Sequence, residues 1–381
     1  MTDSFVPHLQ ERVRRAQAAA TPLVIHGGNT KSFYGAKTIG EAVDMRAYSG
    51  IIAYQPRELV LTVRAGTPLA EIEAAMATEM QILPFEPPHF GAGATIGGSV
   101  AAGLSGPRRP YTGAVRDFVL GTRIVNGKGE DLHFGGRVIK NVAGYDVSRL
   151  MTGAMGTLGV LLDISFKVLP KPARETTLRY EMDQATAIQR FNEWAGKPLP
   201  LSATCWDNGV AMVRLSGTLA GVEAARKKLG GEVVEQTQAA TFWASVRDHS
   251  HPFFENGAAP LWRLSVPATT PVLALPSTPV PSTPLPSTPV PSTPLIEWGG
   301  ALRWLRADAQ SNSHANAQAD TLRQQIAAVG GHATLMRAGT NGVVGHPVFH
   351  PLTGKLAELN RNLKAAFDPA NVLNRGRMDS F

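Results

Sequence analysis

The stretch FGAGATIGGSVAAGLSGPRRPYTG, from Phe90 to Gly113, is rich in glycine and contains no acidic residue. Glycine lets the backbone approach a ligand closely and direct several N–H groups at it, which suits the phosphates of a nucleotide cofactor. Several unrelated nucleotide-binding folds use such loops. The rest of the sequence therefore has to decide among them.

A dinucleotide fingerprint of the Rossmann type does not explain this stretch. Gly91, Gly93 and Gly97 have a similar spacing, but the fingerprint requires a strand directly before it and an acidic residue about twenty positions further on. The preceding segment, residues 83–90, contains prolines that exclude a central parallel strand, and residues 113–116 contain no acidic side chain. A Walker phosphate loop is excluded as well, because its Gly-Lys-Ser/Thr ending is absent.

Two further glycine clusters lie far from this stretch along the chain: IHGGNTK (Ile25–Lys31) and TGAMGTLGV (Thr152–Val160). Around all three clusters, short apolar segments of strand type alternate with helical patterns. The segment VLGTRIV (Val119–Val125), followed by NGKG and EDLHF, predicts a β-hairpin. We therefore expect a mixed fold in which loops from separate segments hold one cofactor.

Taken in order, these motifs resemble the FAD-binding domain of the vanillyl-alcohol oxidase family, the p-cresol methylhydroxylase-type flavoproteins. The resemblance extends over residues 1–172 and the ending FDPANVLNRGRM (Phe367–Met378), and WGGALRWLR (Trp298–Arg306) adds to it. Within the family, the chain is most similar to the FAD-binding E subunits of bacterial glycolate oxidases. The resemblance implies an α+β fold: a two-subdomain FAD-binding domain followed by a cap domain with an antiparallel sheet.

The resemblance also implies which residues contact FAD. A first loop presents consecutive N–H groups to the pyrophosphate, with extra positive charge from its lysine, and contains Gly27, Gly28, Asn29, Thr30 and Lys31. A second loop, in which Ser99 is expected to begin a helix directed at phosphate, contains Gly93, Thr95, Ile96, Gly97, Gly98 and Ser99. A third segment, expected to admit the adenosine half, contains Gly156, Thr157, Gly159 and Val160, and Gly113 completes the set.

One departure from the family bears on how the cofactor is attached. Thr30 stands where members with covalently bound FAD have a histidine, so the FAD of this chain is expected to be non-covalent. His26 comes four residues earlier, on the strand, and is expected to pack there.

The chain is expected to divide into three parts. Residues 1–172 form the FAD-binding domain, residues 173–345 form the cap domain, and residues 346–381 return to the FAD-binding domain. A Pro-Ser-Thr repeat within residues 267–295 cannot bury a core and predicts an extended surface loop.

The sequence shows no recognisable machinery for oxidising a substrate. His332, His346 and His350 are scattered among prolines with no acidic residue close by in sequence, so no metal site is expected and the catalytic residues stay unassigned. The resemblance implies a subunit of a glycolate oxidase or dehydrogenase, whose partners are a larger FAD-containing subunit and an iron–sulfur subunit. The alternative is a self-sufficient flavin oxidase that acts on a small 2-hydroxy acid or a sugar.

Composition restricts the class of protein further. The 381 residues are 43% hydrophobic and 18% charged, which is typical of a globular protein, and the formal net charge is +7. The basic clusters have no interleaved aromatic residues, so nucleic-acid binding is not expected. The single cysteine, Cys205, excludes an internal disulfide and favours a reducing compartment. With no signal peptide or membrane span in the sequence, we expect a cytoplasmic protein that reaches the inner membrane face, if at all, through partners.

Overall fold

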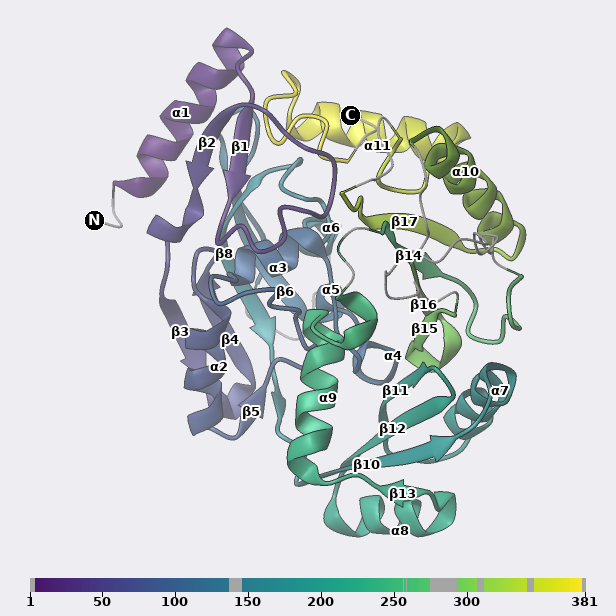
Figure 1. The fold of residues 1–381 in the computed structure, drawn as a ribbon. Coiled ribbons are helices and arrows are strands. Elements are labelled where there is room, and N and C mark those ends of the chain that lie inside the picture. The colour runs from purple at the N-terminus through teal and green to yellow at the C-terminus, as the bar shows by residue number, and fades with distance from the viewer. Residues whose placement is uncertain are drawn as a thin grey trace. The chain divides into compact units, whose positions relative to one another are not determined.

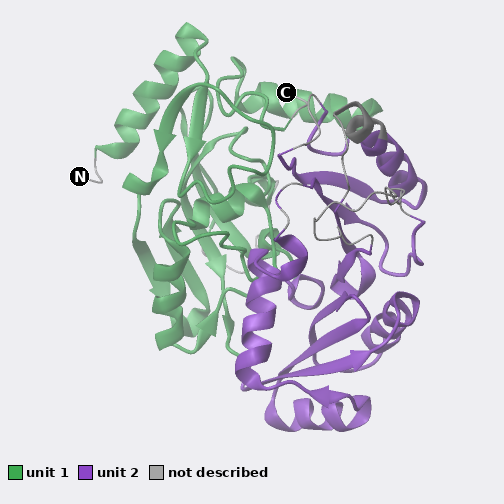
Figure 2. Ribbon diagram, viewed as in Figure 1, with its two compact units in different colours: residues 1–106, 113–171, 351–381 green, residues 107–112, 172–350 purple. Residues whose placement is uncertain are grey.

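The computed structural model describes residues 4–136, 146–255, 257, 259–274, 293–306, 312–340 and 346–378; for residues 312–317 it describes the backbone alone. The chain forms two compact units, each assembled from separate segments (Figure 1, Figure 2). Unit 1 comprises residues 1–106, 113–171 and 351–381, and unit 2 comprises residues 107–112 and 172–350.

Unit 1 contains a five-stranded antiparallel sheet with the order β3-β4-β8-β6-β7. Its strands are β3 (Ile51–Gln55), β4 (Val60–Arg64), β8 (Val160–Lys167), β6 (Val119–Val125) and β7 (Asp131–Gly135). The central strand β8 is buried along most of its length, which explains the nearly continuous apolar run in its sequence. The helices that share the core of this sheet include α2 (Leu69–Thr78) and α3 (Ile96–Ala102).

A second core of unit 1 joins the two ends of the chain. Helix α1 (Phe5–Ala19) buries apolar residues at helical spacing against β1 (Leu23–His26) and β2 (Glu41–Asp44), which pair in parallel. Leu373 also lies in this core and forms a bridge to Leu23. The remaining elements of the unit are η1 (Met45–Ala47), η2 (Pro56–Glu58), β5 (Gln81–Ile82), α5 (Val115–Phe118), α6 (Val147–Leu150), β9 (Leu169–Pro170) and α11 (Gly354–Phe367).

Unit 2 is built on an eight-stranded antiparallel sheet with the order β13-β10-β12-β11-β15-β16-β14-β17. Its strands are β10 (Arg174–Glu181), β11 (Leu201–Asp207), β12 (Val210–Gly217), β13 (Glu232–Val233), β14 (Leu261–Ser265), β15 (Leu295–Glu297), β16 (Leu302–Arg306) and β17 (His332–Arg337). Its helices are α4 (Arg109–Thr112), α7 (Gln184–Ala195), α8 (Leu219–Leu229), α9 (Gln236–Asp248), η3 (Pro252–Phe254), η4 (Trp298–Gly300) and α10 (Asn312–Ala328). Helices α7 and α8 bury their apolar faces in one core, and α10 contributes to another.

The quoted glycine-rich stretch divides between the two units. Residues up to 106 belong to unit 1, whereas residues 107–112 pack in unit 2. There Arg108 is buried and forms an ion pair of 2.6 Å with Glu175, and Arg109 lies over the ring of Trp298, 4.5 Å from its centroid. This part of the stretch therefore anchors the chain in unit 2, a role that its glycine content did not indicate.

The architecture confirms the expected α+β class with antiparallel sheets. The predicted hairpin is present as β6 and β7. Most of the Pro-Ser-Thr repeat lies outside the described residues, which stop at 274 and resume at 293. The assignment of the units to a cofactor-binding domain and a cap domain stays a prediction at this point.

Candidate functional site

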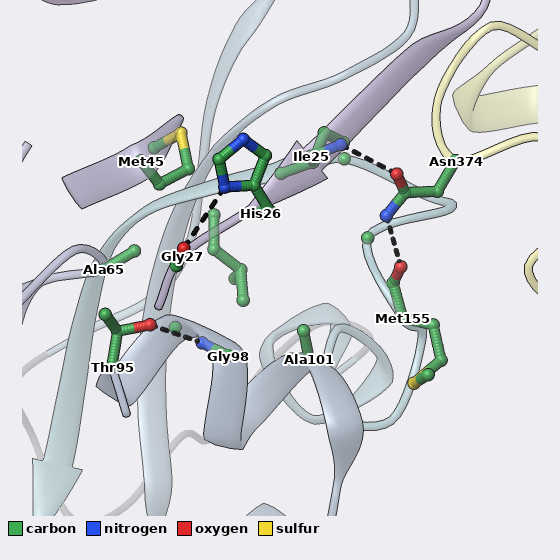
Figure 3. Close-up of a pocket in the computed structure, with 14 residues that line it drawn as sticks. Ile25, His26, Gly27, Met45, Ala65, Thr95, Gly98, Ala101, Met155 and Asn374 are labelled. Carbon is green, nitrogen blue, oxygen red and sulfur yellow. Dashed lines mark hydrogen bonds between the residues drawn. The ribbon is translucent and has the colours of Figure 1, made fainter. Parts of the chain in front are cut away.

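A pocket in unit 1 lies where β1, α3, the 155–159 segment and the C-terminal segment meet (Figure 3). It contains about 420 Å³ of empty space, including space open to solvent. Its walls are formed by Ile25, His26, Gly27, Met45, Ala65, Thr95, Gly97, Gly98, Ala101, Met155, Gly156, Gly159, Leu161 and Asn374. None of these lining residues is acidic, so the pocket suits an anionic or neutral ligand better than a cation.

The pocket brings together six of the residues that the sequence analysis assigned to a cofactor: Gly27, Thr95, Gly97, Gly98, Gly156 and Gly159. The other ten do not line it. They are Gly28, Asn29, Thr30, Lys31, Gly93, Ile96, Ser99, Gly113, Thr157 and Val160.

The first loop, which follows β1, has backbone donors available to a ligand. Within the described part of the chain, the N–H groups of Gly28, Asn29 and Thr30 donate no hydrogen bond. Asn29 has a left-handed backbone with φ of 60°. Successive N–H groups around a left-handed residue form a concave site that attracts anions.

The glycines of this loop are required by packing against the second loop. A Cβ atom on Gly28 would overlap with the carbonyl oxygen of Gly93, and one on Gly27 would overlap with Oγ1 of Thr95. The two glycine-rich loops are therefore in backbone contact. In Figure 3, Gly27 and Thr95 lie on the same side of the pocket.

Lys31 adds positive charge at the end of the first loop. Its side chain is buried, and Nζ lies 3.4 Å from the carbonyl oxygen of His89 and 3.5 Å from Oγ1 of Thr30. Nζ also lies 5.6 Å from the centroid of the Phe90 ring. These contacts hold the ammonium group close to the loop that carries the free N–H groups.

The second loop differs because α3 uses its own first-turn donors. The N–H of Ile96 donates to Thr67, that of Gly97 to Ala65, and those of Gly98 and Ser99 to Thr95. Thr95 is the N-cap, with its Oγ1 accepting the Gly98 N–H at 3.3 Å. Our expectation that Ser99 begins a helix was wrong. Ser99 is buried inside α3, and its Oγ donates to the Thr95 carbonyl.

Gly98 nevertheless faces the pocket. Leaving aside the backbone of α3 itself and the neighbouring residues, a Cβ atom added there would have one described atom within 4 Å, Oγ1 of Thr95 at 3.2 Å. By contrast, a Cβ on Gly97 would lie 2.7 Å from the Cβ of Ala65. Neighbouring glycines therefore have different roles: Gly97 permits packing of α3 on β4 and its continuation, and Gly98 leaves space in the pocket.

The third segment, residues 156–160, packs against the hydrophobic core of unit 1. Val160 is fully buried at the start of β8, and the buried Oγ1 of Thr157 donates to the Ala154 carbonyl at 2.7 Å. A Cβ on Gly159 would lie 2.7 Å from Cδ1 of Ile124. Gly113 lies apart from the pocket, in a turn where φ is 116° and the Asp117 side chain accepts the Ala114 N–H.

His26 is the one titratable residue among the described pocket walls. Its Nδ1 lies 3.2 Å from the Gly27 carbonyl oxygen and 3.9 Å from Oδ1 of Asp44. The hydrogen bond from the Arg46 side chain lowers the pKa of Asp44 below its usual value, so this carboxylate is ionised at neutral pH. As expected, His26 stays on the strand, but it also borders the pocket.

His332, His346 and His350 lie in unit 2. Nδ1 of His346 lies 3.8 Å from Oδ1 of Asp320, and burial lowers the pKa of His332 and of His350. Within the described residues, no three side chains of metal-binding type come together. The catalytic residues stay unassigned.

Sequence analysis missed several pocket residues, chiefly Asn374 and Met155. The signal for Asn374 was present, since it lies in the C-terminal motif that resembles the flavoprotein family. Because Asn374 is far in sequence from the other motifs, there was no reason in the sequence to place it in the same pocket.

Among the described residues, no helix combines the length and the apolar character that a membrane span requires.

Comparison with known proteins identifies the family. Residues 6–135 match the model of an FAD binding domain. The chain is 45% identical over 370 residues to the glycolate oxidase subunit GlcE of Escherichia coli (strain K12), an alignment that covers 97% of this chain and 96% of that protein. The chain belongs to the GlcE family. It is also 31% identical, over 43% of its length and 35% of that protein, to the glycolate oxidase subunit GlcD of Bacillus subtilis (strain 168).

Solved structures show the same fold. The structure of p-cresol methylhydroxylase with substrate bound aligns with a TM-score of 0.69 at 14% sequence identity, covering 98% of this chain and 87% of that one. These findings confirm the expected family, the p-cresol methylhydroxylase type of fold and FAD as the cofactor. They also confirm the class of flavin-linked hydroxy-acid oxidoreductase subunits.

Proposed function

We propose that this chain binds FAD non-covalently and is a subunit of a multi-subunit enzyme that oxidises glycolate to glyoxylate. Support comes from similarity along nearly the whole chain to a glycolate oxidase subunit. The observation that supports the cofactor site is the first loop. There, three successive N–H groups have no acceptor among the described residues, and they adjoin a pocket with no acidic wall residue.

The residues present fit FAD. The N–H groups of Gly28, Asn29 and Thr30 would donate to the pyrophosphate, and Lys31 would offset its negative charge. Gly98 and Gly156 would leave room for the cofactor along the pocket walls. When bound, FAD supplies the two-electron acceptor that conversion of an alcohol to a carbonyl requires.

The remaining sequence-assigned residues would support these contacts. Gly27, Gly93 and Thr95 lie at the contact between the two loops. The N–H groups of Ile96, Gly97 and Ser99 fix the start of α3 by backbone hydrogen bonds, and the third segment is fixed on β8 by Thr157, Gly159 and Val160. Gly113 shapes the turn after the 107–112 segment.

The chemistry of the first loop supports the proposal of non-covalent attachment. Thr30 stands where members with covalent FAD have a histidine, and among the described residues its hydroxyl has one hydrogen bond, which it accepts from Nζ of Lys31 at 3.5 Å. We therefore expect acid precipitation of the yellow protein to leave the flavin in the supernatant. Flavin that stays with the pellet would contradict this part of the proposal.

Electron transfer from the flavin to an iron–sulfur cluster would require a partner chain. Cys205 is the one cysteine of the chain, it is 1% exposed, and burial raises the pKa of its thiol well above the usual value. A cluster ligated by four thiolates cannot be assembled from it. We propose a larger FAD-containing subunit and an iron–sulfur subunit as partners.

Reconstitution tests the assignment. We expect the purified chain to bind FAD but to oxidise glycolate poorly with an artificial acceptor, and turnover to appear when the larger flavin subunit and the iron–sulfur subunit are added. Steady glycolate turnover by the single chain would instead establish a self-sufficient flavin oxidase. A chain that binds no FAD in either setting would refute the cofactor role altogether.

A further inference from the structure

The C-terminal segment contributes an asparagine to the wall of the pocket. Asn374 lies in unit 1, is 5% exposed and has a left-handed backbone with φ of 42°. In Figure 3 its side chain lies between Ile25 and Met155, which belong to segments far apart in the sequence. Asparagine tolerates this backbone region better than most residues, and its side chain makes further contacts.

Both ends of the Asn374 amide are engaged by backbone. Oδ1 accepts the N–H of Ile25 at 2.8 Å, and Nδ2 donates to the carbonyl of Met155 at 2.7 Å. The backbone N–H of Asn374 donates to Leu23 at 2.9 Å. One side chain therefore joins β1, which leads into the loop with the free N–H groups, to the third segment of the pocket.

The fit around the amide is close. A Cβ atom on Gly156 would lie 2.7 Å from Nδ2 of Asn374, so the glycine is needed to admit the amide. Removing the amide would leave the Ile25 N–H and the Met155 carbonyl without their partner at the pocket wall. Since unpaired buried polar groups are unfavourable, the two segments would shift to find other partners.

Two other side chains of the C-terminal segment contact the same parts of the site. The Arg377 guanidinium donates to the carbonyls of Lys31 and Tyr34, in and just after the first loop. Lys364 is buried, and its Nζ donates to the Thr157 carbonyl at 2.6 Å and contacts Asp368 at 2.6 Å. The C-terminal segment thus holds both sides of the pocket by side chain to backbone bonds.

We propose that Asn374 is a positioning residue for FAD: its amide sets the separation of β1 and the 155–159 segment, and so determines cofactor affinity. The inference rests on the proposed binding of FAD in this pocket. Because both polar ends of the amide are already engaged by backbone, Asn374 acts through those segments.

The decisive variant is Asn374→Gly, which keeps access to the left-handed backbone and removes only the side chain. Asn371→Gly is the matched control. Asn371 also has a left-handed backbone, with φ of 49°, lies three residues earlier, and does not line the pocket. Its Oδ1 has no hydrogen-bond partner in the described structure. The entropic effect of the new glycine on the unfolded chain is therefore the same in both variants.

The measurements are the FAD dissociation constant, by titrating apo-protein and following flavin fluorescence, and the melting temperature of the apo-protein. We expect Asn374→Gly to raise the dissociation constant by about tenfold or more, as loss of two buried hydrogen bonds implies, and Asn371→Gly to change it by less than about threefold. Saturating FAD should raise the melting temperature of Asn374→Gly by less than it raises that of the wild type, whereas Asn371→Gly should show the wild-type increase.

A second variant covers the case in which Asn374→Gly does not fold. Asn374→Asp keeps an acceptor for Ile25 but cannot donate to Met155, so it should also weaken FAD binding. The positioning role would be overturned if the folded Asn374 variants bound FAD with wild-type affinity. It would also be overturned if the Asn371 and Asn374 variants lost FAD affinity equally. Failure of the wild-type chain to bind FAD would instead overturn the proposed function.

Discussion

The two glycine-rich loops of unit 1 look alike in sequence and differ in hydrogen bonding. In the loop after β1, the N–H groups of Gly28, Asn29 and Thr30 are not used by the described part of the protein. At the start of α3, from Ile96 to Ser99, every N–H donates within the chain. Glycine content alone therefore does not distinguish a loop that offers donors to a ligand from one that packs closely.

The difference also assigns separate tasks to the two loops. The first loop would bind the anionic part of the cofactor. The second loop would support the first through the contact of Gly93 with Gly28, and the absence of a side chain at Gly98 would leave space in the pocket. If this division is right, substitutions in the two loops should separate folding from cofactor binding.

The largest effect is expected for Gly28→Ala. The added Cβ would overlap with the Gly93 carbonyl oxygen, and because both partners are backbone, a loop has to move. We expect the free energy of unfolding to fall by about 1–3 kcal/mol, as for other overpacked sites, and FAD binding to be lost. Thermal denaturation and flavin absorbance of the purified variant measure the two effects.

Gly93→Ala is the matched control on the other side of that contact. Its Cβ would lie 3.4 Å from the Gly28 carbonyl oxygen, an ordinary contact, so stability and FAD content should stay near wild type. Equal damage from both substitutions would show that the loop contact is not the reason for glycine at position 28.

Gly98→Val is expected to remove FAD with little effect on folding. The new side chain would enter the pocket, where a Cβ atom would lie 3.2 Å from Oγ1 of Thr95, and valine is no worse than glycine in a helix interior. The ratio of flavin to protein absorbance after gel filtration, together with the melting temperature of the apo-protein, checks this. Ala74→Val, on the exposed face of α2, is the control. Unchanged flavin content would mean that the second loop does not border the cofactor.

The smallest effect is expected for Lys31→Met, which tests the charge of the first loop. A positive charge near a phosphate in a partly solvated site contributes on the order of 1 kcal/mol, so the FAD dissociation constant should rise about three- to tenfold. The dependence of binding on ionic strength should weaken in parallel. Lys37→Met, at an exposed position six residues later, should leave both unchanged. If the two variants behave alike, Lys31 has no special part in binding.

Much of the fold was accessible from sequence because it depends on local patterns. The alternation of short strand-type segments with helical patterns predicted a mixed fold, and the Asn-Gly turn predicted the hairpin of β6 and β7. These features follow from periodicity and turn chemistry, which act over a few residues.

The parts that were wrong or missed depend on contacts between distant segments. Ser99 was expected to begin a helix, but the hydrogen bonds of Thr67 and Ala65 to the backbone of residues 96 and 97 start α3 three residues earlier. Residues 107–112 follow the glycine loop directly, yet Arg108 pairs with Glu175 in unit 2. Neither partner could be inferred from neighbouring residues.

By itself, the sequence determined which segments are loops, which are strands and which family the chain belongs to, because these depend on local patterns and ordered motifs. Only the tertiary structure decided which N–H groups remain for a ligand, since each donor can be taken by a distant acceptor. It also decided that Asn374 joins Ile25 to Met155, because hydrogen bonds depend on proximity in space, and Ile25 and Asn374 are 349 positions apart.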